Sequence, residues 1–161
     1  MSILPVEKGE KNKILRTVSS PVKRQKPWGP KQLKKLIQDM EDTMFDLNGV
    51  GIAAPQVGIN LRLALARLNV DTNNELIITL INPEILNLSD EMVDMDEGCL
   101  SLPGRWGSTP RHQSLTVVFE NLKGEKQTLF LEGFNARIIQ HEVGHLNAGL
   151  FIDVAHEVHE A

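Results

Sequence analysis

The pattern of apolar residues predicts two helices, one in the first third of the chain and one close to its end. Between Pro30 and Leu47, apolar residues recur every three or four positions, which predicts an amphipathic helix that ends before Gly49. After Gly133, a second helix is predicted that has one continuous face and a further apolar face, so this helix should be buried nearly all round. The residues of the first face are Phe134, Ile138, His141 and His145.

Between these helices, short apolar or alternating runs predict strands, because period-two alternation is typical of a half-buried strand. Asn82 and Pro83 are expected to end the second strand, and Lys123-Gly124 marks a hairpin turn. The order of helix, strands and helix indicates an α+β fold, with short-stranded mixed or antiparallel sheets packed around the C-terminal helix. The predicted strands are residues 61–68, 76–81, 84–88, 115–120 and 128–131.

Length and composition indicate one globular domain. The 161 residues suffice to bury roughly two-thirds of the unfolded surface, and 41% hydrophobic and 24% charged residues are ordinary for a soluble protein. We expect residues 1–161 to form a single domain, with residues 1–29, which contain three prolines, as an irregular N-terminal arm. No apolar run approaches the roughly 18 residues of a membrane helix, and the first residues lack a signal core. A cytoplasmic protein without a membrane partner is therefore expected.

Positive charge is concentrated near the N-terminus, although the net charge is −4. Ten of the seventeen Lys and Arg residues fall in residues 1–35, against only Glu7 and Glu10. A basic region of this kind can steer a protein towards an anionic surface such as the ribosome. A solvated edge without a partner is the commoner explanation, and we expect no specific DNA binding.

The chemistry is concentrated in residues 140–146, Gln-His-Glu-Val-Gly-His-Leu. His141 and His145 lie four residues apart, so on a helix their Cβ atoms are roughly 5–6 Å apart and both imidazoles can bind one metal ion. Glu142 leans towards the same space. Together they form the H-E-x-x-H pattern, in which one helical turn supplies two ligands and a general base.

A catalytic site of this type needs a third ligand and an open position. Phe151 replaces the third histidine of the metzincin pattern, and Glu157 and Glu160 follow too closely for the distant glutamate of thermolysin-like proteases. Cys99 is the remaining soft donor and would complete a set of one thiolate and two imidazoles. As the only cysteine, it excludes an intramolecular disulfide. A buried Cys99 without chemistry, or a thiol-dependent hydrolase that uses it as nucleophile, are the alternatives.

Residues 49–58 are rich in glycine and alanine, and such small side chains let a backbone approach a ligand or a helix closely. The segment lacks the lysine and Ser/Thr of a P-loop, which excludes a phosphate cradle. Gln56 is the one polar side chain there that could face a substrate. The alternative is a tight turn with an exposed amide.

Three segments resemble, in the same order, the three motifs of the peptide deformylases. They are residues 49–56 (Gly-Val-Gly-Ile-Ala-Ala-Pro-Gln), residues 97–101 (Glu-Gly-Cys-Leu-Ser) and residues 140–146. The similarity covers nearly the whole chain. Its further segments are residues 14–16, 81–84, 110–111 and 150–153.

This resemblance implies a hydrolase that removes the formyl group from the N-terminal formyl-methionine of newly synthesised polypeptides. It also implies an iron(II) ion, replaceable by nickel, cobalt or zinc, held by Cys99, His141 and His145. A divalent cation lowers the pKa of a bound water towards about 7, and the resulting hydroxide is expected to attack the formyl carbon. Glu142 is expected to act as general base and then as general acid.

The resemblance also assigns roles around the metal. The side-chain amide of Gln56 and the backbone N–H of Leu100 are expected to bind the developing oxyanion. Glu97 is expected to support the cysteine loop. By analogy, Gly51 and Arg111 bind the peptide backbone. The candidates for the methionine pocket, for which ordinary core packing is an equal alternative, are Val50, Phe134 and Ile138.

The chain departs from the family at two positions, Gly144, where members usually carry Asp, and Ala148, where they usually carry Gly. Gly inside a helix costs roughly 1 kcal/mol relative to Ala, so we expect a complete but less rigid site. Asn147 or Gly149 is expected to end the helix, and Gly149 can take the place of the missing glycine one residue later. The alternative function is a deformylase-like protein that binds metal or formylated peptides with little or no turnover.

Overall fold

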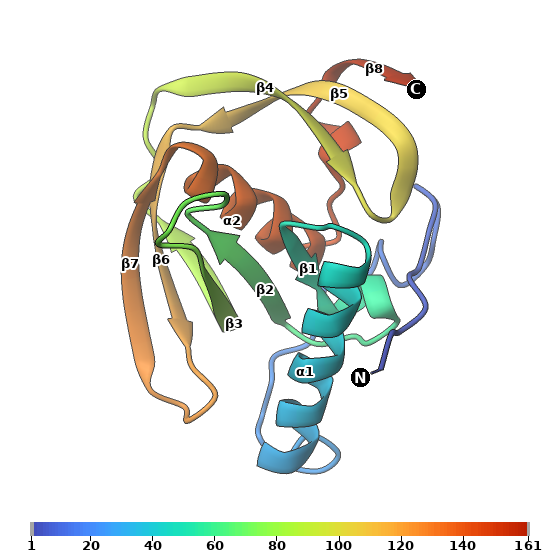
Figure 1. Ribbon diagram of the computed structural model, residues 1–161, viewed down its shortest axis with the longest axis vertical. Coiled ribbons are helices and arrows are strands. Elements are labelled where there is room, and N and C mark those ends of the chain that lie inside the picture. The colour runs from blue at the N-terminus through green and yellow to red at the C-terminus, as the bar shows by residue number, and fades with distance from the viewer. Residues whose placement is uncertain (1, 161) are drawn as a thin grey trace.

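The computed structural model describes residues 2–160 and contains two α-helices and two β-sheets (Figure 1). The prediction of an α+β fold is confirmed. Within residues 2–160, no helix is both long and apolar enough to cross a membrane. The elements in chain order are α1 (Pro30–Asp46), β1 (Gly51–Ala53), the 3₁₀ turn η1 (Ala54–Val57), β2 (Leu63–Leu68), β3 (Leu76–Leu86), β4 (Met92–Cys99), β5 (Leu102–His112), β6 (Ser114–Glu120), β7 (Lys126–Glu132), α2 (Gly133–Leu146), the 3₁₀ turn η2 (Phe151–Asp153) and β8 (His156–Glu160).

Both sheets are antiparallel throughout. The larger sheet has five strands in the order β1-β2-β3-β6-β7, and the smaller sheet has three in the order β4-β5-β8. Helix α2 contacts strands of both sheets, and Figure 1 shows it between the β4–β5 hairpin and the larger sheet. The helix that carries His141 and His145 is therefore covered on two sides.

Strand β2 explains how the larger sheet holds a helix on each face. Successive side chains of a strand point to opposite faces. Ala64 and Ala66 belong to the apolar cluster that includes α2, while Leu63 and Leu65 belong to the cluster that includes α1. Both faces are fully buried at these positions. Because the alanine side chains on the α2 face are small, α2 can lie close to the sheet.

The N-terminal arm forms no helix or strand of its own within residues 2–29 and runs past α1, η1 and the C-terminal end of α2 before it reaches the larger sheet. Its one bridge pairs Ser20 with Leu61. Further along, the side chain of Asn82 exchanges two hydrogen bonds with the backbone of Val22, at 2.8 and 3.0 Å. These contacts hold the arm in place.

Several strands differ from the sequence-based prediction, which did not include β1, β4, β5 or β8. β3 does not end at Asn82 and Pro83 but continues to Leu86, because a register shift between Ile81 and Glu84 absorbs the proline. Asn82 itself has a left-handed φ of 51°. The acidic stretch before Cys99 forms β4, whose residues 92–96 are exposed, so apolar alternation gave no signal for it.

Helix α2 ends differently from our expectation that Gly149 takes over this role. The N–H of Gly149 donates to the carbonyl of Gly144 at 2.8 Å, and the N–H of Ala148 donates to that of His145 at 3.2 Å. These two bonds define a Schellman motif, whose left-handed position is normally glycine. Here Ala148 occupies it, with φ 65°. The expectation for Gly149 is therefore wrong, whereas Asn147, the other predicted end of the helix, is its C-cap.

Candidate metal centre and active site

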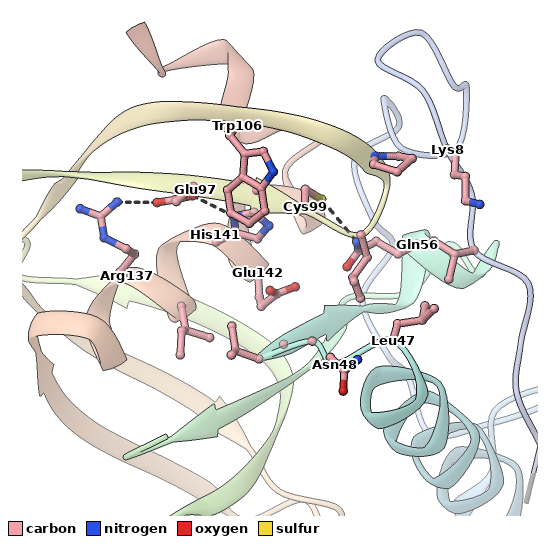
Figure 2. Close-up of a pocket in the computed structure, with 18 of the residues that line it drawn as sticks. Lys8, Leu47, Asn48, Gln56, Glu97, Cys99, Trp106, Arg137, His141 and Glu142 are labelled. Atoms are coloured by element: carbon pink, nitrogen blue, oxygen red, sulfur yellow. Dashed lines mark hydrogen bonds and ion pairs between the residues drawn. The ribbon is translucent and has the colours of Figure 1, made fainter. Parts of the chain in front are cut away.

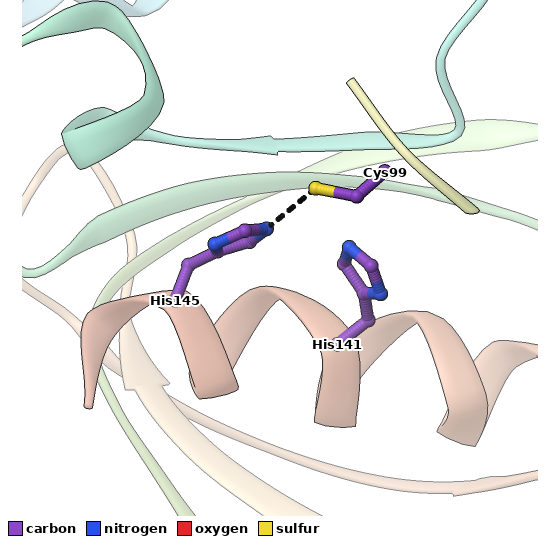
Figure 3. Close-up of side chains that lie close together, drawn as sticks. All are labelled: Cys99, His141 and His145. Carbon is purple, nitrogen blue, oxygen red and sulfur yellow. Dashed lines mark hydrogen bonds between the residues drawn. The ribbon is translucent and has the colours of Figure 1, made fainter. Parts of the chain in front are cut away.

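Three side chains form a cluster that suits a metal ion (Figure 3). Cys99 stands at the end of β4, and His141 and His145 lie on successive turns of α2. Their ligand atoms lie within 4.8 Å of one another, and Cys99 Sγ is 3.3 Å from His145 Nε2. A thiolate with two imidazoles is a donor set that binds divalent transition metals. The residues therefore fit the metal that the sequence indicates.

The charges within the cluster favour the thiolate. Burial alone would raise the pKa of Cys99, but the imidazoles of His145 and His141 outweigh burial and hold that pKa well below its usual value. The thiolate is the form of cysteine that binds metals. Burial opposes a charged His141, while hydrogen bonds to Cys99 and Glu97 and the charge of Glu142 raise the pKa of His141 to about 10.

Glu97 fixes the orientation of the His141 imidazole. His141 Nδ1–H donates to Glu97 Oε1 at 2.9 Å, and this leaves Nε2 free to bind a metal. Arg111 donates to both oxygens of the same carboxylate, each at 2.9 Å. Burial alone would raise the pKa of Glu97, but the hydrogen bonds from Arg111 and His141 lower it to about 2.

Arg137 is a member of this network that the sequence reasoning missed. It lies one turn before His141, is 5% exposed, and donates to Glu97, to the Thr109 carbonyl at 2.8 Å and to the Val93 carbonyl at 2.6 Å. Figure 2 shows its ion pair with Glu97. Arg137 thus joins α2 to both strands of the hairpin that carries Cys99. The available signal was an arginine between Ala136 and Ile138 in a helix that was predicted to be buried nearly all round.

A cavity of about 690 Å³ opens beside the cluster, which is a size typical of small-ligand sites. Its lining comes from the N-terminal arm, β1, the β4–β5 hairpin and α2, and it includes Trp106, which the sequence reasoning did not select. Nearly all of the predicted substrate-binding and oxyanion residues line this cavity. They are Val50, Gly51, Gln56, Leu100, Phe134 and Ile138.

Arg111 is not among the residues that line the cavity. Its guanidinium is held by Glu97, and its side chain is 13% exposed. The structure therefore does not bring it to the peptide-binding position that the analogy suggested. A donor already engaged with a buried carboxylate has its charge neutralised and its geometry set.

Gln56 is held by three contacts. Its Oε1 accepts a hydrogen bond from the N–H of Ala53 at 2.9 Å, and its Nε2 donates to Ser101 Oγ at 3.1 Å and faces Cys99 Sγ at 3.6 Å. Ser101 had not been selected from the sequence. The amide is therefore oriented before any ligand arrives.

Glu142 points into the cavity and is 3% exposed (Figure 2). Among residues 2–160, its Oε1 has no hydrogen-bond partner. Burial raises the pKa of Glu142, against the opposing effect of His141 and His145. A carboxylate with a raised pKa and no hydrogen-bond donor is well suited to accept a proton.

The fold and this site define a metal-dependent hydrolase: a cysteine and two histidines that can hold a metal, a free buried carboxylate beside them, and a ligand-sized cavity. Comparison with known proteins identifies the family. Residues 3–161 match the family model "Polypeptide deformylase", and a peptide deformylase of Carboxydothermus hydrogenoformans is 42% identical over 145 residues, which are 90% of this chain and 89% of that protein. The chain therefore belongs to the peptide deformylases, metal-dependent enzymes that remove the formyl group from nascent peptides.

Solved structures agree with this assignment. A class I type b peptide deformylase from Acinetobacter baumannii superimposes with a TM-score of 0.85 at 39% identity, covering 96% of this chain and 99% of that one. A probable peptide deformylase from the Synechococcus phage S-SSM7 gives a TM-score of 0.84 at 34% identity, covering 94% and 99%.

Proposed function

We propose that residues 1–161 form one catalytic domain, in which α2 is the central helix that carries the metal and Cys99, His141 and His145 are the ligands. Iron(II) is the proposed metal, with nickel, cobalt or zinc as substitutes. The support is the approach of the three donor atoms within 4.8 Å. When bound, the metal supplies Lewis-acid chemistry at the formyl group.

Glu142 is the proposed general base and acid. It takes the proton of the attacking water and then passes it to the amine that leaves with the methionine residue. The observation that carries this proposal is the buried Glu142 carboxylate, which lies at the cavity without a partner for Oε1 among residues 2–160. Its raised pKa favours the transient protonated form.

The oxyanion that develops on the formyl oxygen is bound by the side-chain amide of Gln56 and the backbone N–H of Leu100. The bond from Ala53 to Gln56 Oε1 fixes the amide, so its N–H groups need little reorganisation to reach the substrate. A bound formyl oxygen would compete with Ser101 and Cys99 for these N–H groups. Loss of one such donor typically costs about 10²–10³ in turnover.

The methionine side chain occupies the apolar part of the cavity near Val50, Phe134 and Ile138, and the backbone of Gly51 binds the peptide. Phe134 is 43% exposed, as expected for a residue at an open cavity. For Arg111 we propose support of Glu97 in place of peptide binding, because both of its hydrogen bonds go to that carboxylate.

We further propose that the enzyme acts in the cytoplasm, where its formylated substrates emerge, and that the basic N-terminal region favours approach to the ribosome. The support is the excess of Lys and Arg in residues 1–35.

Formate release from formyl-Met-Ala-Ser tests the catalytic proposal. The protein would be purified without oxygen, loaded with iron, and compared with Glu142→Ala at equal metal content. We expect release by the wild type and a loss of about 10²–10⁴ in kcat for the variant. Wild-type protein that holds one metal per chain and releases no formate would contradict turnover and favour the binding-protein alternative.

A further inference from the structure

Gly51 lies unusually close to Glu142. A Cβ atom added at Gly51 would be 2.5 Å from Oε2, 2.8 Å from Cδ and 2.9 Å from Cγ of that side chain. The φ angle of Gly51 is not in the left-handed region, so the backbone conformation does not require glycine. Glycine is required here because a side chain at residue 51 would have no space beside Glu142.

The contact matters because little else holds the carboxylate of Glu142. Its Oε1 has no hydrogen-bond partner among residues 2–160, and the side chain is buried. In place of such a bond, van der Waals packing against neighbouring atoms can orient the group.

The surface against which Glu142 packs is itself well fixed. Gly51 pairs with Ala66 and Ile52 pairs with Leu65 in the antiparallel ladder between β1 and β2. Both Ile52 and Ala66 are fully buried. The backbone of Gly51 therefore forms a rigid wall on one side of the Glu142 side chain.

We propose that Gly51 is a positioning residue, and that its missing side chain leaves the space in which Glu142 is held at the reacting group. This role is additional to the contact of its backbone with the peptide, and it rests on the proposed function of Glu142 as the base. A side chain at residue 51 displaces the carboxylate, and a misplacement of about 1 Å in a reacting group can cost about 10²-fold in rate.

Thermal unfolding of four proteins tests the contact without any use of activity. They are the wild type, Gly51→Ala, Glu142→Ala and the double variant, all with the same metal. Because Glu142→Ala removes the three atoms nearest to the new methyl group, we expect Gly51→Ala to lower the Tm of the wild type and to leave the Tm of Glu142→Ala nearly unchanged. An equal decrease in both backgrounds would overturn the proposal.

Kinetics then test the positioning role. We expect Gly51→Ala to lower kcat about 10- to 100-fold with little change in KM. Gly144→Ala is the matched control, since a Cβ there meets nothing within 4 Å, and its kcat should equal that of the wild type. A change confined to KM would assign Gly51 to peptide binding alone and overturn the proposal.

Glu142→Asp provides a partial rescue, because it vacates the Oε2 and Cδ positions at 2.5 and 2.8 Å from the added methyl group and leaves only the Cγ position at 2.9 Å. The double variant Gly51→Ala/Glu142→Asp should lose less activity than the product of the two single losses, by at least about tenfold. Losses that simply multiply would overturn the positioning role. The proposal that Glu142 is the base is tested separately, because full formate release by Glu142→Ala would contradict it whatever the effect of Gly51→Ala.

Discussion

Replacement of Ala148 by glycine should stabilise the protein, although glycine usually destabilises. Ala148 occupies the left-handed position of the Schellman motif after α2, with φ 65°. A side chain in that conformation costs roughly 1–2 kcal/mol, while glycine costs roughly 0.5–1 kcal/mol in additional entropy of the unfolded chain. The balance favours glycine by about 1 kcal/mol.

For a chain of 161 residues, such a gain raises Tm by about 2–4 °C. Differential scanning calorimetry of Ala148→Gly and wild type, each with the same metal, measures the shift. Ala136→Gly is the control, because it makes the same chemical change inside α2 rather than after its end. Glycine inside a helix costs about 1 kcal/mol, so the Tm of this variant should fall. A Tm of Ala148→Gly at or below that of the wild type would refute the reasoning.

Three further variants test the site and the helix that carries it. Gly144→Asp should raise Tm by calorimetry, because a Cβ at residue 144 has open space around it and glycine weakens the helix; an unchanged or lower Tm contradicts this. Glu97→Gln should weaken zinc binding about 10- to 100-fold in a chelator competition, since the acceptor of His141 changes from a charged carboxylate to a neutral amide. Unaltered affinity would exclude the orienting role of the carboxylate. The pKa of Glu97 is lowered in the folded state, so its ionised form contributes about 3 kcal/mol to the free energy of unfolding above pH 4.5, and this contribution is lost as the pH falls towards about 2. In urea unfolding, the free energy of unfolding of Glu97→Gln should therefore fall less between pH 4.5 and pH 2 than that of the wild type. Arg137→Met should lower the free energy of unfolding, measured in urea, by about 3–5 kcal/mol, because it breaks a buried ion pair. A decrease below about 1 kcal/mol would count against Arg137 as the link between α2 and the hairpin.

Local spacing predicted the parts of this protein that depend on one element. His141, Glu142 and His145 stand on one helix, so a period of 3.6 residues is enough to bring them together. The alternation of β6 and β7 likewise predicted their hairpin. These features need no knowledge of the tertiary structure.

The features that were missed depend on contacts between elements. β4 is exposed along residues 92–96 and shows no apolar alternation, although it carries the third candidate ligand at its end. The bonds of Arg137 to two strand carbonyls, and the contact of Gly51 with Glu142, exist only after β1, α2 and the hairpin have packed together. No spacing within the sequence reports such distances.

The claim on which the account depends is that Cys99, His141 and His145 hold one metal ion. X-ray absorption of the zinc-loaded protein measures this directly, with Cys99→Ser as the comparison. We expect one sulfur at about 2.3 Å and two imidazole nitrogens at about 2.0–2.1 Å, and loss of the sulfur shell in the variant. A shell of nitrogen and oxygen alone in the wild-type protein, or a spectrum that Cys99→Ser leaves unchanged, would contradict the assignment of the site.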